Sequence, residues 1–302
     1  MAASLQSRVK TPTLPELRLV HEHDENFPVA LWFLPKAWRH AIQVIYAFAR
    51  RADDFADEGS YPAEERLAKL DVYWQHLQAL ENGDLQTLKD PFFLVLNEII
   101  QKHQLPIDPF FDLLLAFKQD VLKSEYANQA ELQDYCRHSA NPIGRLLLHL
   151  TQHDTPDNQE ASDRLCTALQ LLNFWQDVLL DLRDRQRCYL PDNDLRIFGI
   201  TPQSILNNSA NAEQYRHLIQ LQLNHIRPLL SAAAPLSARL RGRFGFQIRF
   251  VQHCAQHLHY LLLHRRDYRK RPKLGILNWI YLFLKTLIHT GLLCLQRAVS
   301  HV

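Results

Sequence analysis

Two short groups of aspartates carry the clearest chemical signal in the sequence. The first box, Asp53–Asp57, reads Asp-Asp-Phe-Ala-Asp, and the second box, Asp177–Asp181, reads Asp-Val-Leu-Leu-Asp. On a helix, residues four apart share a face, and like charges there cost about 0.2–0.5 kcal/mol per pair. Apolar residues surround the second box, so its carboxylates are costly to bury without a cationic partner. We therefore expect a cation beside the boxes.

Magnesium fits this pattern because it takes oxygen ligands and typically bridges one or two carboxylates to substrate phosphates. Two facing boxes would hold two or three such ions around a diphosphate and stabilise the charge that builds on the leaving group. Asn173, four residues before Asp177, would add a neutral oxygen ligand, although ordinary helix hydrogen bonding explains it equally well. For each box the alternative is a solvated acidic patch.

Arginines stand next to both boxes. Arg50 and Arg51 precede the first box, and Arg183, Arg185 and Arg187 follow the second. The guanidinium group matches phosphate oxygens well, but it also forms ion pairs with carboxylates, and the two uses are compatible. The arginines therefore favour a diphosphate site between the boxes.

Composition points to a large helical protein. The chain has 302 residues, is 47% hydrophobic and contains only 8 glycines, fewer than the turns of a large β-sheet protein normally need. The formal net charge of +2 gives no indication of nucleic-acid binding. The 5 cysteines form no CxxC pair, which favours a reducing cytosol, and the N-terminal residues lack the apolar core of a signal peptide.

Apolar periodicity and helix-stop residues predict an all-α protein with a loose N-terminal arm at 1–24 and one helical domain over 25–302. The predicted helices cover about 35–57, 62–82, 91–103, 108–123, 129–152, 160–186, 212–231, 236–264 and 276–298.

The last helix is the most apolar segment, yet polar residues recur along one of its faces, which makes it amphipathic. A basic cluster at 265–273 precedes it, and this combination suits an anionic membrane surface. A core helix that follows a solvated charged loop is an equal alternative, and a helix that spans the membrane is the least favoured.

Three stretches resemble the squalene/phytoene synthase family. They are Tyr46-Ala-Phe-Ala-Arg-Arg-Ala-Asp-Asp-Phe-Ala-Asp-Glu58, Asn173-Phe-Trp-Gln-Asp-Val-Leu-Leu-Asp181 and Arg187-Cys-Tyr-Leu-Pro191, and the resemblance covers roughly residues 24–272. It implies the class I isoprenoid synthase fold, a helical bundle with a central active-site cavity, and magnesium-assisted loss of diphosphate.

By motif position, the resemblance implies roles for individual residues. The metal ligands would be Asp53, Asp57, Asn173, Asp177 and Asp181. The diphosphate would be bound by Arg50, Gln170, Asn173, Arg187 and Tyr189. Tyr46 would lie at the reactive centre with the box aspartates, and Phe27 would stabilise a carbocation through its aromatic face.

Two further stretches resemble the hydroxysqualene synthases of bacterial hopanoid pathways. They are Asn26-Phe-Pro-Val-Ala30 and Tyr135-Cys-Arg-His-Ser-Ala-Asn-Pro-Ile-Gly144. In squalene and phytoene synthases the latter commonly has a second tyrosine, which is thought to assist the condensation of two farnesyl diphosphates, and here His138 replaces it. The resemblance therefore implies a lyase that converts presqualene diphosphate into hydroxysqualene by water capture, without NADPH.

Two alternatives remain at this point. One is a head-to-head synthase that makes squalene, phytoene or dehydrosqualene from two prenyl diphosphates. The other is a non-catalytic, membrane-associated assembly protein of the same fold. The expected partners are a prenyl diphosphate, a membrane surface and other enzymes of squalene and hopanoid synthesis, but no nucleic acid. The expected location is the cytoplasm, with peripheral attachment to the inner membrane surface as an option.

Overall fold

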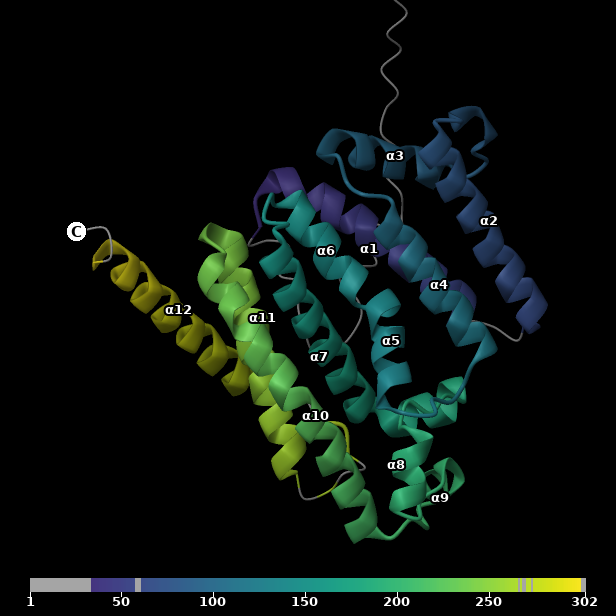
Figure 1. Cartoon of the computed structure of the whole chain (residues 1–302), viewed down its shortest axis with the longest axis vertical. Coiled ribbons are helices and arrows are strands. Elements are labelled where there is room, and N and C mark those ends of the chain that lie inside the picture. Colours follow the sequence, from purple (N-terminus) through teal and green to yellow (C-terminus); the bar gives the residue numbers. More distant parts are fainter. Residues whose placement is uncertain (1–33, 58–60, 266, 268–269, 273, 300–302) are drawn as a thin grey trace, which may run out of the picture.

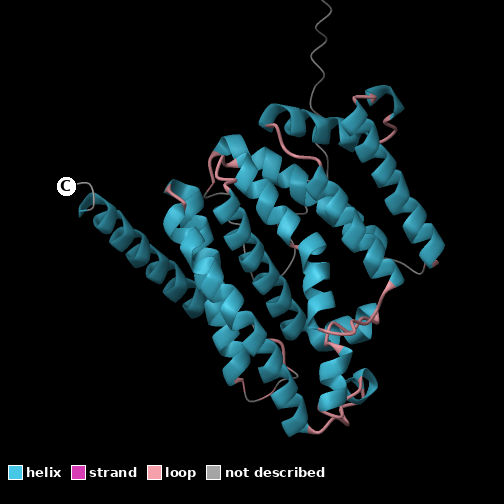
Figure 2. Cartoon of the chain, viewed as in Figure 1, coloured by secondary structure: helices cyan, strands magenta, loops and turns pink. Residues whose placement is uncertain are grey.

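The structure, a computed structural model, describes residues 34–57, 61–265, 267, 270–272 and 274–299. Within these residues the regular structure is helical and contains no strand (Figure 2), so the all-α prediction is confirmed. The longer helices are α1 (Lys36–Asp57), α2 (Ala63–Asn82), α3 (Pro91–His103), α4 (Asp108–Leu122), α5 (Gln129–Ser139), α6 (Asn141–Leu150), α7 (Pro156–Leu180), α10 (Ala212–Arg239), α11 (Gly242–His264) and α12 (Ile276–Val299). Short elements are η3 (Leu85–Thr87), η4 (Asp181–Arg185), α8 (Asp192–Ile197) and α9 (Pro202–Leu206).

Helix α7 lies at the centre of the bundle (Figure 1), where it packs against α5, α6, α10 and α11. Its start is well specified, because the Thr155 side chain accepts a hydrogen bond from the Asn158 amide and Pro156 occupies the first turn. Leucine and aromatic residues on several of its faces are buried, including Leu171, Leu172 and Trp175. A helix buried on most sides is a rigid support for the second box at its C-terminal end.

The predicted single helix over 129–152 is wrong. The chain breaks at Ala140 into α5 and α6, because Pro142 in the first turn of α6 has no amide hydrogen to continue the hydrogen bonds of α5. Asn141 accepts a hydrogen bond from the Thr167 hydroxyl of α7 (3.0 Å), which fixes the break against the central helix.

Two other helix boundaries differ from the prediction. Helix α10 continues through Pro228 and Pro235 to Arg239, and the break falls at Leu240 and Arg241, just before Gly242, whose φ of +62° suits glycine. Arg249 donates to the carbonyl oxygens of Ser237 and Leu240 and so caps the end of α10.

The helix predicted over 160–186 begins earlier, at Pro156, and its α-helical part ends at Leu180, within the second box. After Leu180 the chain continues as the π-helical turn η4 and ends at Gln186 with φ +55°. The short helices α8 and α9 that follow were not predicted. They lie below the C-terminal end of α7 in Figure 1, and α9 contacts η4.

Helix α12 packs against α11 at the outer edge of the bundle (Figure 1), close to its predicted range of 276–298. Its segment Ile276–Gln296 is long and apolar enough to cross a membrane, which by itself is weak evidence for a span. The predicted arm at 1–24 lies outside the described residues.

Candidate active site

A cavity of about 600 Å³ lies between α1, α6, α7, α10 and α11, within the usual size range for ligand pockets. One part of its wall is apolar and is formed by Ile143, Leu147, Leu148, Leu165, Leu169, Leu236, Phe244, Ile248 and Val251. Another part is polar and carries Tyr46, Arg50, Asp53, Gln170, Asn173, Asp177, Asp181, Arg185 and Arg271. An amphipathic ligand with one anionic end matches this division.

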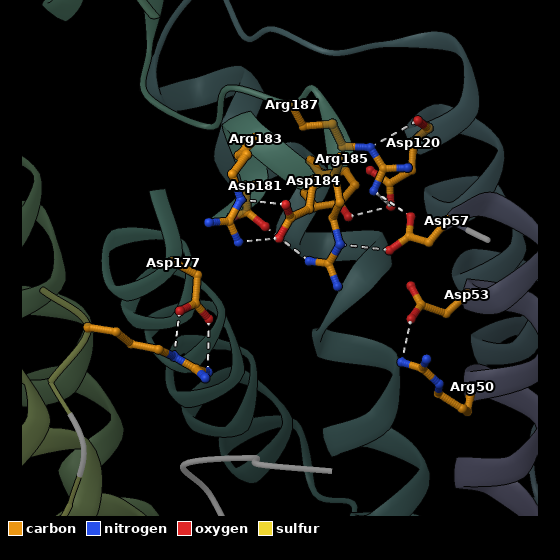
Figure 3. Close-up of polar contacts among 12 residues, drawn as sticks. Arg50, Asp53, Asp57, Asp120, Asp177, Asp181, Arg183, Asp184, Arg185 and Arg187 are labelled. Atoms are coloured by element: carbon orange, nitrogen blue, oxygen red, sulfur yellow. Dashed lines mark hydrogen bonds and ion pairs between the residues drawn. The ribbon is translucent and has the colours of Figure 1, made fainter. Parts of the chain in front are cut away.

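The polar groups come from regularly spaced positions on two helices. Gln170, Asn173 and Asp177 lie on the cavity-facing side of α7 at helical spacing, and Tyr46, Arg50 and Asp53 do so on α1. The α7 wall extends from Ser162 to Asp177, about 22 Å at 1.5 Å per residue. The two boxes face each other across a gap (Figure 3).

Arg185 joins the two boxes. Its Nε lies 3.0 Å from Asp57 Oδ2, and its Nη1 lies 3.0 Å from Asp181 Oδ1 (Figure 3). The π-helical turn η4 carries Arg185 at its last position and thereby brings it back over the second box. Arg185 also lines the cavity, so its guanidinium is placed both to hold the carboxylates and to meet an anion.

Asp57, like Asp54, does not line the cavity, in contrast to Asp53, Asp177 and Asp181. Arg187 Nη1 lies 2.7 Å from Asp57 Oδ1, an ion pair without hydrogen-bond geometry, and Arg185 contacts the other oxygen. Arg187 is buried and also lies outside the cavity wall. The structure thus places Asp57 and Arg187 behind the cavity, where they support its wall, and their predicted ligand roles stay predictions.

Asp120 on α4 is a buried acidic group that the sequence analysis missed. Arg187 Nε donates to its main-chain oxygen (3.1 Å), and the Tyr135 hydroxyl donates to its Oδ2 (2.8 Å). Burial raises the pKa of Asp120 to about 7, against the opposing effect of Arg187. A lone aspartate in an amphipathic helix has no pattern that would have identified it.

Burial also raises the pKa of the cavity carboxylates. The pKa of Asp53 is raised to about 6, by burial first and by the neighbouring charge of Asp57 second. Burial raises the pKa of Asp181 to about 7, and that of Asp177 also rises, although Arg271 opposes it. Asp181 is buried, and Asp53 and Asp177 are partly buried. The nearby arginines do not fully offset the cost of burying their charges, and a bound cation would add the missing positive charge.

The donor set suits magnesium shared with a ligand better than a cage made by protein alone. Within the described part of the chain, no three His, Cys, Asp or Glu side chains form a ready metal site. Asp53 lies on one wall, and Asn173, Asp177 and Asp181 lie on the other, and all offer oxygen atoms to the cavity. Magnesium ions held by such walls would be completed by diphosphate oxygens and water.

Arg271 lines the cavity, although the sequence predicted no role for it there. It belongs to the basic cluster, yet its Nε lies 2.6 Å from Asp177 Oδ1 and its Nη2 donates to Oδ2 (3.1 Å). Gln176 donates to the Pro272 carbonyl oxygen (2.6 Å), and Arg265 donates to that of Trp175 (3.3 Å). This part of the cluster is therefore fastened to the end of α7 and contributes a cation to the cavity.

The remaining predicted residues divide into three groups. Tyr46, Arg50, Gln170 and Asn173 line the cavity, and Arg50 pairs with Asp53 (3.3 Å) and Asp54 (2.7 Å). Tyr189 is buried outside the cavity, stacked on Phe174 with ring centroids 3.7 Å apart. Phe27 lies outside the described residues.

Comparisons with known proteins agree with this geometry. A profile described as squalene/phytoene synthase matches residues 20–277. The hydroxysqualene synthase of Zymomonas mobilis is 32% identical over 262 residues, which cover 84% of this chain and 86% of the relative. The 15-cis-phytoene synthase of Synechococcus elongatus is 27% identical and covers 72% of each chain. The crystal structure of squalene synthase HpnC from Alicyclobacillus acidocaldarius superposes with a TM-score of 0.73 at 31% identity and covers 85% of this chain and 94% of that one.

Proposed function

Because this chain belongs to the squalene/phytoene synthase family and has the isoprenoid synthase helical fold, we propose that it is a hydroxysqualene synthase that acts on presqualene diphosphate. The names of its relatives support this choice. Those called hydroxysqualene synthase reach 32% identity, whereas the phytoene synthases named in the comparison with curated proteins reach 29% at most.

The position of His138 carries the proposal. The family commonly has a tyrosine here, and the neighbours Ser139 and Ala140 line the cavity, but His138 does not. Its Nδ1 lies 3.1 Å from the Asp134 carbonyl oxygen, and its Nε2 lies 4.0 Å from Asp112 Oδ1. This position therefore offers no phenol to the cavity to assist condensation of two farnesyl diphosphates, which favours a substrate that is already condensed.

The proposed reaction begins when the carbon–oxygen bond of presqualene diphosphate breaks and its electron pair leaves with the diphosphate. Bound magnesium would neutralise charge on the departing oxygens. Arg50, Arg185 and Arg271 line the cavity near the boxes and add fixed positive charge for the same anion. The cyclopropylcarbinyl cation rearranges, one water molecule adds to it, and the loss of a proton gives hydroxysqualene.

The cavity wall supports this chemistry in two ways. Leucine, isoleucine and phenylalanine side chains on α6, α7 and α11 surround the hydrocarbon and keep bulk water away from the cation. Tyr46 lines the cavity beside the polar groups, and in this proposal its ring stabilises developing positive charge. We assign the same protein a cytoplasmic location and a place in hopanoid synthesis.

Product analysis with two substrates tests the proposal. Purified protein with magnesium and no NADPH is incubated with presqualene diphosphate or with farnesyl diphosphate. We expect hydroxysqualene from presqualene diphosphate and no product from farnesyl diphosphate. Formation of presqualene diphosphate or a polyene from farnesyl diphosphate would overturn the substrate assignment.

Variants of the boxes test the site. Asp53→Asn and Asp177→Asn should each lower turnover at least a hundredfold while the far-ultraviolet circular dichroism stays unchanged, because each removes a cavity carboxylate. Glu98→Gln, an exposed carboxylate on α3, is the matched control. Full activity in either box variant would contradict the metal-assisted mechanism.

A further inference from the structure

The outward face of α12 carries a continuous row of large apolar side chains, which we call the apolar stripe. Its members recur every three or four residues and are between 45% and 78% exposed: Ile276, Leu277, Ile280, Tyr281, Leu284, Leu287, Ile288, Leu292, Leu295 and Val299. Single exposed apolar residues are normal on a protein surface, but a row along a whole helix is a contiguous patch. Such a patch marks an interaction surface.

The opposite face of α12, which contacts α11, combines apolar residues such as Leu282 and Phe283 with hydrogen-bonded polar groups. Thr286 is fully buried and its Oγ1 lies 2.8 Å from His253 Nδ1, while Arg249 Nε donates to Thr290 Oγ1 (2.9 Å). His289 Nδ1 lies 3.3 Å from His253 Nε2 in the same interface. A surface helix of a water-soluble protein normally turns its polar residues outward, whereas the outward residues of α12 are largely apolar. These hydrogen bonds fix the rotation of α12 and keep the apolar stripe outward.

Charge around the apolar stripe indicates what covers it. From Tyr268 to the C-terminus the sequence contains no Asp or Glu, but it contains Arg269, Lys270, Arg271, Lys273, Lys285 and Arg297. Among those described, Arg271 is paired with Asp177 and Lys270 lies 3.8 Å from Asp267, but the Lys270 side chain is still 85% exposed. Two copies of this face would bring cations together, whereas an anionic lipid surface complements it.

We propose that the apolar stripe is a docking surface for an anionic lipid bilayer and that α12 lies in the plane of that surface. Helix α11, which belongs to the bundle, covers one side of α12 along Leu282, Thr286 and Thr290, so lipid reaches only the other side. An amphipathic helix with cations nearby binds in this way, with its apolar face at the headgroup and acyl boundary. The surface is independent of the reaction proposed above.

Vesicle flotation with the full chain tests the proposal. We expect the protein to float with vesicles of phosphatidylcholine and phosphatidylglycerol, less with phosphatidylcholine alone, and less at high salt. The double variant Leu284→Asp/Ile288→Asp should reduce binding at least tenfold, because it places two charges in the apolar stripe. Val72→Asp/Leu122→Asp, which alters exposed apolar residues on α2 and α4, should bind as the unchanged protein does.

Lys270→Glu should weaken binding to anionic vesicles and leave the weaker binding to neutral vesicles intact. The melting temperature shows whether each variant is folded, and Leu284→Gln/Ile288→Gln replaces the double aspartate variant if that one is not.

Light scattering in lipid-free buffer gives the molar mass. A dimer that the stripe variants convert to monomer, without vesicle binding, would make the stripe a subunit interface and overturn the proposal. Absence of both vesicle binding and dimerisation would overturn it as well.

Discussion

At the scale of single residues, the site is a network of arginines that hold buried carboxylates. Arg187 contacts Asp57 and Asp120, Arg185 contacts Asp57 and Asp181, and Arg271 contacts Asp177. The sequence predicted the boxes and the neighbouring arginines, because all of them lie in short local motifs. It did not predict Asp120 or the partner of Arg271, since these contacts join residues 67 and 94 positions apart.

Asp120 should make the metal-free protein less stable as the pH rises. Burial raises its folded-state pKa from 3.8 to about 7, so its stabilising contribution is complete below about pH 4 and is lost as the pH approaches 7. Asp120→Asn should remove this loss, which for one proton is at most about 1.4 kcal/mol per pH unit. Urea unfolding of both proteins across that pH range measures the difference. Equal pH dependence in the two proteins would contradict the predicted state of Asp120.

At the scale of elements, the width of the cavity depends on how closely α6 approaches α7. Gly144 on α6 lines the cavity, and a Cβ atom there would lie 2.5 Å from Ser162 Oγ and 2.6 Å from Cys166 Sγ. Both distances are shorter than real contacts, so glycine is required for this approach. The sequence predicted helical structure around Gly144 but neither the break between α5 and α6 nor the close approach of α6 to α7, because that approach depends on contacts with residues distant in the sequence.

Gly144→Ala should therefore destabilise the protein by about 1–3 kcal/mol, as overpacked cores do. The triple variant Gly144→Ala/Ser162→Ala/Cys166→Ala should recover much of this loss, because it removes both atoms that the new methyl group meets. Gly275→Ala, where a Cβ meets nothing within 4 Å, is the control. Denaturant midpoints compare the variants. A triple variant as unstable as the single one would show that the helix backbones, not these side chains, limit the spacing.

At the scale of the whole molecule, the two boxes come from α1 and from the end of α7, which are far apart in the sequence, and only the fold brings them face to face. A magnesium diphosphate complex would contact both walls at once, whereas either component alone satisfies only part of the site. A ligand that binds only the folded state stabilises it by about 2.7 kcal/mol when its free concentration is a hundred times its dissociation constant.

At a hundred times their dissociation constant, magnesium and inorganic pyrophosphate together should thus raise the melting temperature by about 5 °C. The conversion uses a shift of roughly 2–4 °C for each kcal/mol of stabilisation in a large domain. Magnesium alone or pyrophosphate alone should shift it less. Asp53→Asn and Asp177→Asn should each abolish the combined effect, and Glu98→Gln should retain it. Differential scanning fluorimetry measures the melting temperature of each protein under each ligand condition. A full shift in either box variant would place the ligand elsewhere.

What the sequence by itself determined was local. Helical periodicity specifies the all-α class, and the four-residue spacing of the aspartates with the arginines beside them predicts a site for a metal-bound anion. Only the tertiary structure decided which residues line the cavity and which pair with one another. It places Asp57 and His138 outside the cavity wall and pairs Arg271 with Asp177. It also turns the apolar side of α12 outward. These features depend on contacts between distant residues, and such contacts leave no periodic pattern in the chain.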